Sequence, residues 1–526
     1  MQTNATASIH NNELEIYKKK YQQLESRNQE LETKIKETEW KYLEIKERYD
    51  ILIYKKFGRS AEQILAGEKQ PSLFSIEAAP QEEDTETKQE EYSEIKSHTR
   101  KKPGRKPLDP KLHREEKIID IPELEKTCAC GSNLTKIGEE SSEKLHIIPP
   151  RIYVERTVRP KYACRCCEGT EDESKASVRI APVEPAIIPR SIVSPSLLST
   201  IIVQKFEDHL PYYRQEKQFE RIWVKISRQD MSNWQQQAYQ RLLPLFELLH
   251  MTVKSGPVIQ MDETTVQVMG EEGREDTQKS YMWLARGGPP GKTVVLYEYR
   301  QTRGANNAKE FLAGYSGYLQ TDGYEGYDAA VKGLPGIIHV GCFAHARRKF
   351  YEASKATKKP QSAEEGIKHI RKLYALEEEL RSQYLDSSVF LNERKARAGP
   401  ILENFKVWLI KRKEEIPPTL LLGKAIYYSL AQWEKMTAYL ESPYLTPDNN
   451  ACENAIRPFV LGRKNWLFSK SPEGAESSCG MYSLIQTAKQ NGIIPFKYLT
   501  ALFEKAPLAN SLEGWEKLLP WNILTG

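Results

Sequence analysis

The sequence predicts a multidomain protein in which a long N-terminal helix, a small cysteine-rich module and a helical region precede an α/β core. Three observations lead to this fold class. The chain has 526 residues, which is more than one compact core accommodates. Residues 13–55 contain no proline or glycine, and strand-like segments follow from residue 256. The net charge is only +5, which is compatible with an anionic partner without requiring one.

Residues 1–65 are expected to form a coiled-coil dimerisation helix. A heptad register fits the segment, and ten of its twelve core positions are apolar or aromatic. Asn28 occupies one core position and favours a parallel, in-register dimer, because a buried amide is satisfied by its own copy in the partner chain. One long amphipathic helix packed on its own protein is the alternative. The core positions are Leu14, Tyr17, Tyr21, Leu24, Asn28, Leu31, Ile35, Thr38, Tyr42, Ile45, Tyr49 and Leu52.

Residues 66–118 are predicted to form a disordered acidic linker followed by a basic arm. The linker, which includes "APQEEDTETKQEEYSE", has too few apolar residues to pack. In the arm, cations alternate with proline and glycine, a composition typical of extended segments that enter a DNA minor groove or follow phosphates. A solvated linker explains this stretch equally well. The cations are Arg100, Lys101, Lys102, Arg105 and Lys106.

Residues 119–170 are predicted to form a zinc-binding ribbon. The chain opens with a polar segment rather than a signal peptide, so a reducing cytoplasm is expected, where clustered cysteines bind metal rather than form disulfides. Two close pairs of thiolates suit a structural zinc with no open position for water. The segment between the pairs, "RIYVERTVRPKYA", alternates like a strand. The expected ligands are Cys128, Cys130, Cys164 and Cys167, with Cys166 as a competitor.

Residues 171–255 are predicted to be helical and to resemble a DNA-binding helix-turn-helix. Ser227 is placed to cap a helix in which Met231, Trp234 and Ala238 recur on one face. The opposite face would present polar side chains to solvent. An ordinary helical hairpin explains the pattern nearly as well. The outward residues are Arg228, Gln229, Ser232 and Asn233.

Residues 256–475 are predicted to form the α/β core. Three strands ("GPVIQMDETTVQV", "SYMWLARGG", "KTVVLYEY"), a short helix ("AKEFLAGY") and a fourth strand ("GYLQTDGYEGY") follow one another in the order of a ribonuclease H-like sheet. Asp262 and Asp322 would then lie on adjacent strands. Two close carboxylates repel, so we expect a raised pKa or a shared divalent cation, magnesium or manganese. A turn aspartate before glycine is the alternative for Asp322.

Glu453, in "DNNACENAIRPFVLGRKNWLFS", is the third candidate acid. Together with Asp262 and Asp322 it would hold two metal ions for an in-line displacement at phosphorus. A capping box with Asn450 is the alternative role of Glu453. Asp448 is a rival ligand that lies earlier, in the expected loop.

Cationic and aromatic side chains near these acids are expected to contact DNA phosphates and bases. Three of them lie in "GCFAHARRKF", where Cys342 is expected to pack in the core. A mostly helical insertion is predicted at about 352–440, and a C-terminal helical region at 476–526. The candidates for DNA contact are His345, Arg347, Arg348, Arg457, Arg463, Lys464 and Trp466.

Eight segments, none of them sufficient alone, together resemble DDE transposases of the insertion sequence 66 family, the large TnpC-type protein, over nearly the whole length. They are "KKFGRSAEQ", "RPKYAC", "KFEDHLPYYRQE", "MDETTVQV", "QTDGYEGY", "GCFAHARRKF", "DNNACENAIRPFVLGRKNWLFS" and "YSLIQTAKQNG". The resemblance implies a leucine-zipper-like N terminus, a zinc module, a ribonuclease H-like core with a helical insertion and a small C-terminal region. It places the acidic triad on Asp262, Asp322 and Glu453.

The expected function is metal-dependent cleavage at the ends of a bacterial DNA element, followed by strand transfer into target DNA. The expected partners are terminal inverted repeats, target DNA, further copies of the chain bound through the coiled coil, and accessory proteins of the element. No membrane partner is expected, and the expected location is the cytoplasm, at the nucleoid. Two alternatives are an inactive DNA-binding repressor of element ends and a metal-dependent nuclease without joining activity. Intact acids at all three positions argue against the first.

Overall fold

The computed structural model describes five stretches of the chain and divides into two compact units. One unit comprises residues 1–75 and 184–526, and the other comprises residues 76–183. The predicted zinc ligands, the acidic linker and the cations of the basic arm lie outside the described residues, so these expectations stay predictions. Within the described stretches, no helix is both long and apolar enough to cross a membrane. The stretches are residues 2–57, 152–163, 178–356, 361–384 and 386–523.

In the smaller unit, two short strands pair antiparallel, β1 (Lys161–Ala163) and β2 (Val178–Ile180). Arg159 extends the pairing, because its Nη1 donates to the carbonyl of Ala181 at 2.8 Å. The strand expected across the whole segment before Cys164 is therefore confined to its last three residues. Pro160 explains where it begins, since proline has no N–H to donate to a strand ladder.

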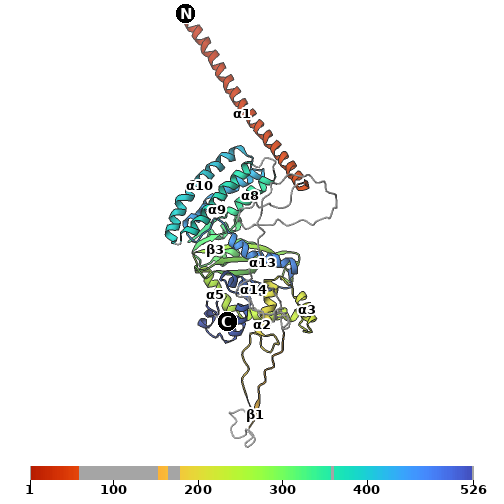
Figure 1. The fold of residues 1–526 in the computed structure, drawn as a ribbon. Helices are drawn as coiled ribbons and strands as arrows, with labels where there is room; N and C mark the ends of the chain where they lie inside the picture. Colours follow the sequence, from red (N-terminus) through yellow and green to blue (C-terminus); the bar gives the residue numbers. More distant parts are fainter. Residues whose placement is uncertain (1, 58–151, 164–177, 357–360, 385, 524–526) are drawn as a thin grey trace, which may run out of the picture. The chain divides into compact units, whose positions relative to one another are not determined.

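The N-terminal segment of the larger unit forms one unbroken helix, α1 (Gln2–Phe57), as its lack of proline and glycine predicts (Figure 1). From Tyr21 onward, the apolar core positions of the heptad are between 43% and 69% exposed. This stripe is what a coiled coil would bury against a second helix. Its pairing with another copy of the chain stays a prediction.

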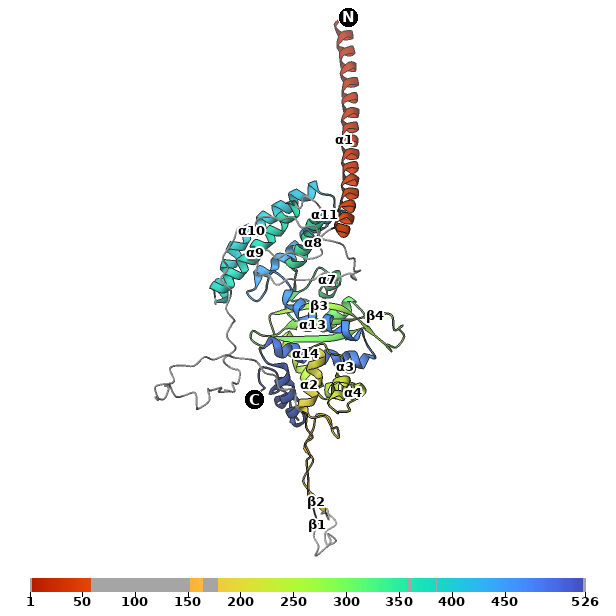
Figure 2. The ribbon, with the colours of Figure 1, turned by 45° about the vertical axis from the view of Figure 1, so that its right-hand side comes forward.

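A mixed sheet of six strands forms the centre of the larger unit (Figure 2). Its order is β5-β4-β3-β6-β7, with β3 antiparallel to β4 and parallel to β6, and with β8 paired to the far end of β3. The longest strand therefore lies in the middle, between the antiparallel and the parallel halves. The strands are β3 (Val258–Val268), β4 (Lys279–Gly287), β5 (Val294–Arg300), β6 (Gly317–Gln320), β7 (Ile337–Val340) and β8 (Phe468–Ser469).

Helix α14 (Pro472–Gln490) covers the outer edge of β5. Ser483 Oγ accepts a hydrogen bond from the N–H of Tyr297 at 2.9 Å, and Thr487 Oγ1 accepts one from the N–H of Val295 at 3.0 Å. The two hydroxyls are one helical turn apart and match alternate residues of the strand. An unpaired edge can pair with another chain. The segment "YSLIQTAKQNG" therefore has a structural role in closing this edge.

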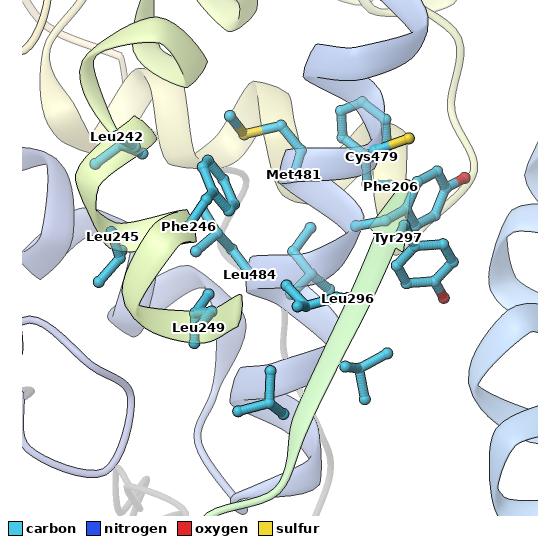
Figure 3. Close-up of a cluster of buried hydrophobic side chains, with 14 of the residues drawn as sticks. Phe206, Leu242, Leu245, Phe246, Leu249, Leu296, Tyr297, Cys479, Met481 and Leu484 are labelled. Atoms are coloured by element: carbon cyan, nitrogen blue, oxygen red, sulfur yellow. The ribbon is translucent and has the colours of Figure 1, made fainter. Parts of the chain in front are cut away.

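The main apolar core lies between β5 and two helices, α5 (Leu243–Lys254) and α14 (Figure 3). Phe246 of α5 lies beside Leu484 of α14, and Leu296 of β5 approaches the same place. All three side chains are buried. This core lies on the face of the sheet opposite α8 (Phe343–Lys355), α9 (Gln361–Gln383) and α10 (Ser387–Glu415) (Figures 1 and 2).

Three helices precede α5. The predicted cap at Ser227 is confirmed, because Ser227 and Asp230 form a capping box at the start of the third helix. Met231, Trp234 and Ala238 are buried, as their spacing predicts, and the outward residues are exposed except Ser232, which is partly buried. The helices are α2 (Pro195–Phe206), α3 (Tyr212–Arg221) and α4 (Arg228–Arg241).

Between β5 and the third acid, helices occupy most of the chain. The insertion has an apolar core of its own, which includes Phe350, Phe405 and Trp433. The elements are α6 (Ala305–Leu312), α7 (Glu325–Val331), α8 (Phe343–Lys355), α9 (Gln361–Gln383), α10 (Ser387–Glu415), α11 (Leu421–Ala431), α12 (Trp433–Thr437) and η2 (Ala438–Glu441). Then follow α13 (Asn450–Trp466), α14, α15 (Pro495–Lys505), η3 (Ala506–Leu508) and α16 (Leu512–Glu516).

Candidate active site

Strand register brings Asp262 and Asp322 to the same level of the sheet. β3 and β6 run parallel with Gln260 opposite Gln320, and each aspartate follows its glutamine by two residues. The glutamine side chains hydrogen-bond to each other at 2.9 Å. Asp262 lies within β3, whereas Asp322 lies two residues past the end of β6, where the N–H of Tyr324 donates to Asp322 Oδ1 at 3.0 Å. One carboxylate therefore lies on a central strand and the other just past the end of its parallel neighbour.

The surroundings of Asp262 disfavour its charged form. Burial raises the pKa of Asp262 well above its usual value, and the nearby carboxylates of Glu263, Glu453 and Asp322 raise it further. The N–H of Glu263 donates to Asp262 Oδ1 at 2.9 Å, which offsets only part of this effect. A divalent cation among these carboxylates would stabilise their ionised forms.

Glu453 is brought to the aspartates by the first turn of α13. Asn449 fixes this turn to β3, because its Nδ2 donates to the carbonyl of Met261 at 3.0 Å. The capping-box alternative for Glu453 is wrong: the helix starts after Asn449 without a side-chain cap bond. The Glu453 side chain, 8% exposed, instead lies 3.6 Å from His345 Nδ1 and 3.5 Å from an Nη of Arg348. Burial raises the pKa of Glu453 to about 7 although Arg348 lowers it.

Asp448 has a different role from Glu453. It is buried, and both of its carboxylate oxygens accept hydrogen bonds from Asn450, one from the backbone N–H at 3.0 Å and one from Nδ2 at 2.7 Å. These bonds form an Asx-type turn that leads into α13. The geometry thus assigns Asp448 to the helix start and leaves Glu453 facing the sheet.

Among the described residues, one group of three potential metal ligands has donor atoms within 4.8 Å of one another: Cys342, His345 and Glu453. Asp262 and Asp322 do not join this group, so the carboxylate oxygens of Asp262, Asp322 and Glu453 do not all lie within 4.8 Å of one another. His345 Nδ1 and Glu453 Oε1 are buried without hydrogen-bond partners among the described residues. Such orphaned donors and acceptors fit a cation or a polar substrate group.

Cys342 was expected in the core, and its surroundings agree. It is 1% exposed, its Sγ accepts a hydrogen bond from the N–H of Asn449 at 3.2 Å, and burial strongly raises the pKa of its thiol. Oxygen donors, by contrast, are the ligands that magnesium prefers. The carboxylates of Asp262, Asp322 and Glu453 therefore fit a hard divalent cation better than a set that includes this thiol.

Of the residues predicted to contact DNA, some are engaged inside the fold. Arg463 donates to Thr264 Oγ1 at 3.0 Å and to the carbonyl and hydroxyl of Thr265, which holds α13 on β3. Trp466 packs edge-on against Phe206, with ring centroids 6.4 Å apart. Arg463 therefore faces β3 and Trp466 faces α2, a placement that the basic, aromatic composition of the segment did not reveal.

Other predicted contacts remain accessible. Arg457 and Lys464 are exposed on α13, and Arg348 lies beside Glu453. His345 and Arg347 are partly buried on α8, the helix that follows β7. Burial, followed by the charge of Arg348, lowers the pKa of His345 to about 4, so the imidazole is neutral at pH 7. Their contact with DNA stays a prediction.

A buried network beside the aspartates was missed by sequence reasoning. Glu263, with a side chain only 1% exposed, accepts hydrogen bonds from Arg303 Nε at 2.6 Å and from the hydroxyl of Tyr327. Arg303 also stacks on the ring of Tyr324, 3.9 Å from its centroid, and Tyr324 holds Asp322 through its N–H. The repeated Gly-Tyr in "TDGYEGY" was the available signal.

The chain matches the family model "Transposase IS66 family" over residues 190–477, which is more than half of its length. The chain belongs to the IS66 transposase family. Further matches are "zinc-finger binding domain of transposase IS66" over residues 125–168, "IS66 C-terminal element" over 483–521 and "Transposase C of IS166 homeodomain" over 44–116. The IS66 match over 190–477 covers Asp262, Asp322 and Glu453.

Relatives of this IS66 protein occur in Sinorhizobium fredii. The protein named "Uncharacterized protein y4qI" is 34% identical over 452 residues, which cover 82% of this chain and 80% of the relative. "Uncharacterized protein y4jD" is 32% identical over 424 residues, or 78% and 80% of the two chains. "Uncharacterized protein y4hP" is 31% identical over 452 residues, or 82% and 78%. Similarity therefore extends over most of the chain rather than over one domain.

The family matches bear on two expectations from the sequence. The zinc-finger match contains all four of the predicted zinc ligands and supports a structural zinc there. The match over 44–116 contains the basic arm and supports DNA binding by the N-terminal part. Membership of a transposase family implies a divalent cation, and the carboxylates of Asp322 and Glu453 lie near enough to Asp262 to raise its pKa.

Proposed function

We propose that this chain is a DDE transposase with a ribonuclease H-like core, in which Asp262, Asp322 and Glu453 hold two magnesium or manganese ions. The observation that carries the proposal is the grouping of the three acids: Asp262 on β3 and Asp322 just past β6 lie at the same register, and Asp322 and Glu453, the latter in the first turn of α13, both lie near enough to raise the pKa of Asp262. The strand order, three antiparallel strands followed by two parallel ones, supports the proposed core.

The reaction has two phosphoryl transfers. In the first, water attacks a phosphorus atom at the end of the element, and the broken P–O bond leaves a 3′ hydroxyl. In the second, that hydroxyl attacks a phosphorus of the target strand, and a target 3′ oxygen leaves. Bound metal ions would activate the attacking oxygen and stabilise the leaving oxygen. Both transfers use one site.

The residues around the acids would position them and the DNA. The N–H of Tyr324 orients Asp322, and Asn449 holds the start of α13 on β3 beside Asp262. Arg348 is placed to contact a phosphate, since it lies 3.5 Å from Glu453 at the edge of the acidic cluster. His345, neutral at pH 7, can exchange hydrogen bonds with DNA without adding charge.

We further propose that the chain acts on DNA in the bacterial cytoplasm as a dimer or larger assembly formed through α1, with the inverted repeats of its element and a target duplex as substrates. The exposed apolar stripe of α1 supports the oligomer. Other proteins of the element are candidate accessory partners.

The test combines full-length protein, magnesium and a labelled duplex that carries the DNA flanking this gene. Wild type is expected to yield both cut ends and joined products, and Asp322→Asn is expected to yield neither while it still binds the duplex. Glu325→Gln is the matched control, because Glu325 is an exposed acid three residues away. Cleavage by Asp322→Asn at the wild-type rate would refute the assignment. Cleavage by wild type without joining would favour a nuclease.

A further inference from the structure

Trp223 is the most exposed large apolar side chain among the described residues. It lies in the connection between α3 and α4 and is 95% exposed, and its neighbour Ile222 is 48% exposed. Tryptophan is on average one of the more buried residue types, and its burial contributes strongly to core stability. Trp234 and Trp283, for comparison, are 7% and 4% exposed. The indole of Trp223 therefore adds little to the packing of its own domain.

The backbone at Trp223 is in a conformation that favours glycine. Its φ is +65°, its N–H donates to the carbonyl of Glu220 at 3.1 Å, and the N–H of Val224 donates to the carbonyl of Phe219 at 3.0 Å. This pair of bonds is a Schellman motif, in which the left-handed position after the helix is usually occupied by glycine. A side chain with a Cβ atom is disfavoured there. The chain thus keeps an indole where glycine would be more stable, in contact with water.

The surroundings of the indole in the chain are cationic. The nearby acids are engaged within the helices: Glu220 pairs with Lys217 at 2.8 Å, and Asp230 belongs to the capping box of α4. The exposed polar face of α4 begins five residues after Trp223, and the two helices lie side by side (Figure 2). The exposed cations on either side of the indole are Arg221, Lys225 and Arg228.

We propose that Trp223 is a DNA-contacting wedge, whose indole packs against the bases of duplex DNA while Arg221 and Lys225 contact the flanking phosphates. An apolar side chain between cations is the arrangement by which many proteins insert between base steps. Strain retained at an exposed position points to function rather than to folding. The inference rests on the proposed function, because it requires that the protein binds DNA, and it assigns the corner between α3 and α4 as one of its contacts.

The test is Trp223→Gly in the full-length protein. DNA affinity is measured by fluorescence anisotropy with a labelled duplex from the DNA flanking this gene and with a shuffled duplex. Loss of one base contact by an aromatic ring is expected to weaken binding about tenfold. The thermal midpoint is expected to stay the same or to rise, because glycine suits the left-handed position. A structural role for the indole predicts the opposite change in the midpoint.

Three further variants sharpen the comparison. Trp223→Phe is expected to keep most of the affinity, since it retains an aromatic ring. Arg221→Ala is expected to weaken binding and to lower the salt slope by about one, whereas Trp223→Gly leaves the slope unchanged. Leu512→Ala is the matched control, because Leu512 is 62% exposed on α16, and it is expected to bind like wild type.

The outcomes separate this inference from the proposed function. If wild type and Trp223→Gly bind the duplex equally, the inference is wrong and the transposase proposal stands. If Trp223→Gly changes the sedimentation coefficient but not the DNA affinity, the indole contacts a second copy of the chain, which also overturns the inference. If wild type binds no DNA and cuts none, both proposals fail.

Discussion

Replacement of the buried Arg394 by alanine is expected to lower the free energy of unfolding by about 3 kcal/mol. The guanidinium is fully buried, lies 2.7 Å from Glu377 and donates to three backbone carbonyls. Loss of one member of a buried ion pair costs about 3–5 kcal/mol, because it leaves an uncompensated charge. Arg381 also lies 2.8 Å from Glu377, which places the expected cost at the lower end of that range. The carbonyls belong to Tyr439, Ser442 and Leu445.

The same substitution is expected to impair DNA cleavage more than DNA binding. The three carbonyls lie in the segment that leads from the insertion to α13, and α13 carries Glu453. Without Arg394 this segment loses three hydrogen bonds and keeps the bond from Arg381 to the carbonyl of Leu445, so the approach to α13 is loosened and Glu453 is positioned less firmly. The DNA contacts proposed at the corner between α3 and α4 lie on other elements and should persist.

Urea unfolding followed by tryptophan fluorescence measures the stability, and the labelled-duplex assay measures cleavage. Arg397→Ala is the matched control, because Arg397 lies on the same helix in a pair with Glu379 that is about 40% exposed on each side. Exposed pairs contribute at most about 1 kcal/mol. Arg394→Lys should fall between the two, since it keeps the charge but loses the fork of donors. Equal stability of Arg394→Ala and Arg397→Ala would refute the reasoning.

Three other predictions follow from particular contacts. Ser483→Ala leaves the N–H of Tyr297 unpaired and should cost about 1–3 kcal/mol in thermal unfolding. Thr500→Ala removes only an exposed hydroxyl bond within its own helix and should not, so equal midpoints would contradict the role of α14 at the sheet edge. Burial lowers the pKa of Lys205 to about 7, so between pH 7 and 10.5 the unfolded chain binds a proton that the folded chain does not, and the free energy of unfolding rises with pH. Lys205→Met should therefore raise Tm at pH 7, and the rise in Tm should shrink toward pH 10. A rise in Tm that does not change with pH would contradict the lowered pKa of Lys205. Leu31→Glu puts a charge on the exposed stripe of α1 and should shift sedimentation from dimer to monomer, and an unchanged assembly would exclude a coiled coil there.

Features set by neighbouring residues could be predicted from the sequence. The uninterrupted α1, the cap at Ser227, the strand that carries Asp262 and the strand that ends before Asp322 all follow from local composition, side-chain periodicity and turn residues. These signals act over a few residues, and the surrounding fold agrees with them here. Pro160 is another local feature of this kind. Because proline has no N–H to donate, the strand expected before Cys164 is limited to β1.

Features set by contacts between distant segments could not be predicted in this way. No sequence pattern tells that Glu453 faces His345 and Arg348 rather than its own helix end, or that Asp448 turns back to Asn450. Those choices depend on how α13 packs on β3.

The sequence by itself determined which reactive groups the chain carries, because its carboxylates, cysteines and basic segments are fixed by residue type. The tertiary structure decided which of these groups meet. It put Arg463 into bonds with β3, it surrounded Glu263 with Arg303 and Tyr327, and it left Trp223 in water at a position suited to glycine. Burial and hydrogen bonding depend on the whole packed chain, so only the folded arrangement distinguishes a side chain that supports the fold from one that is free to act on a partner.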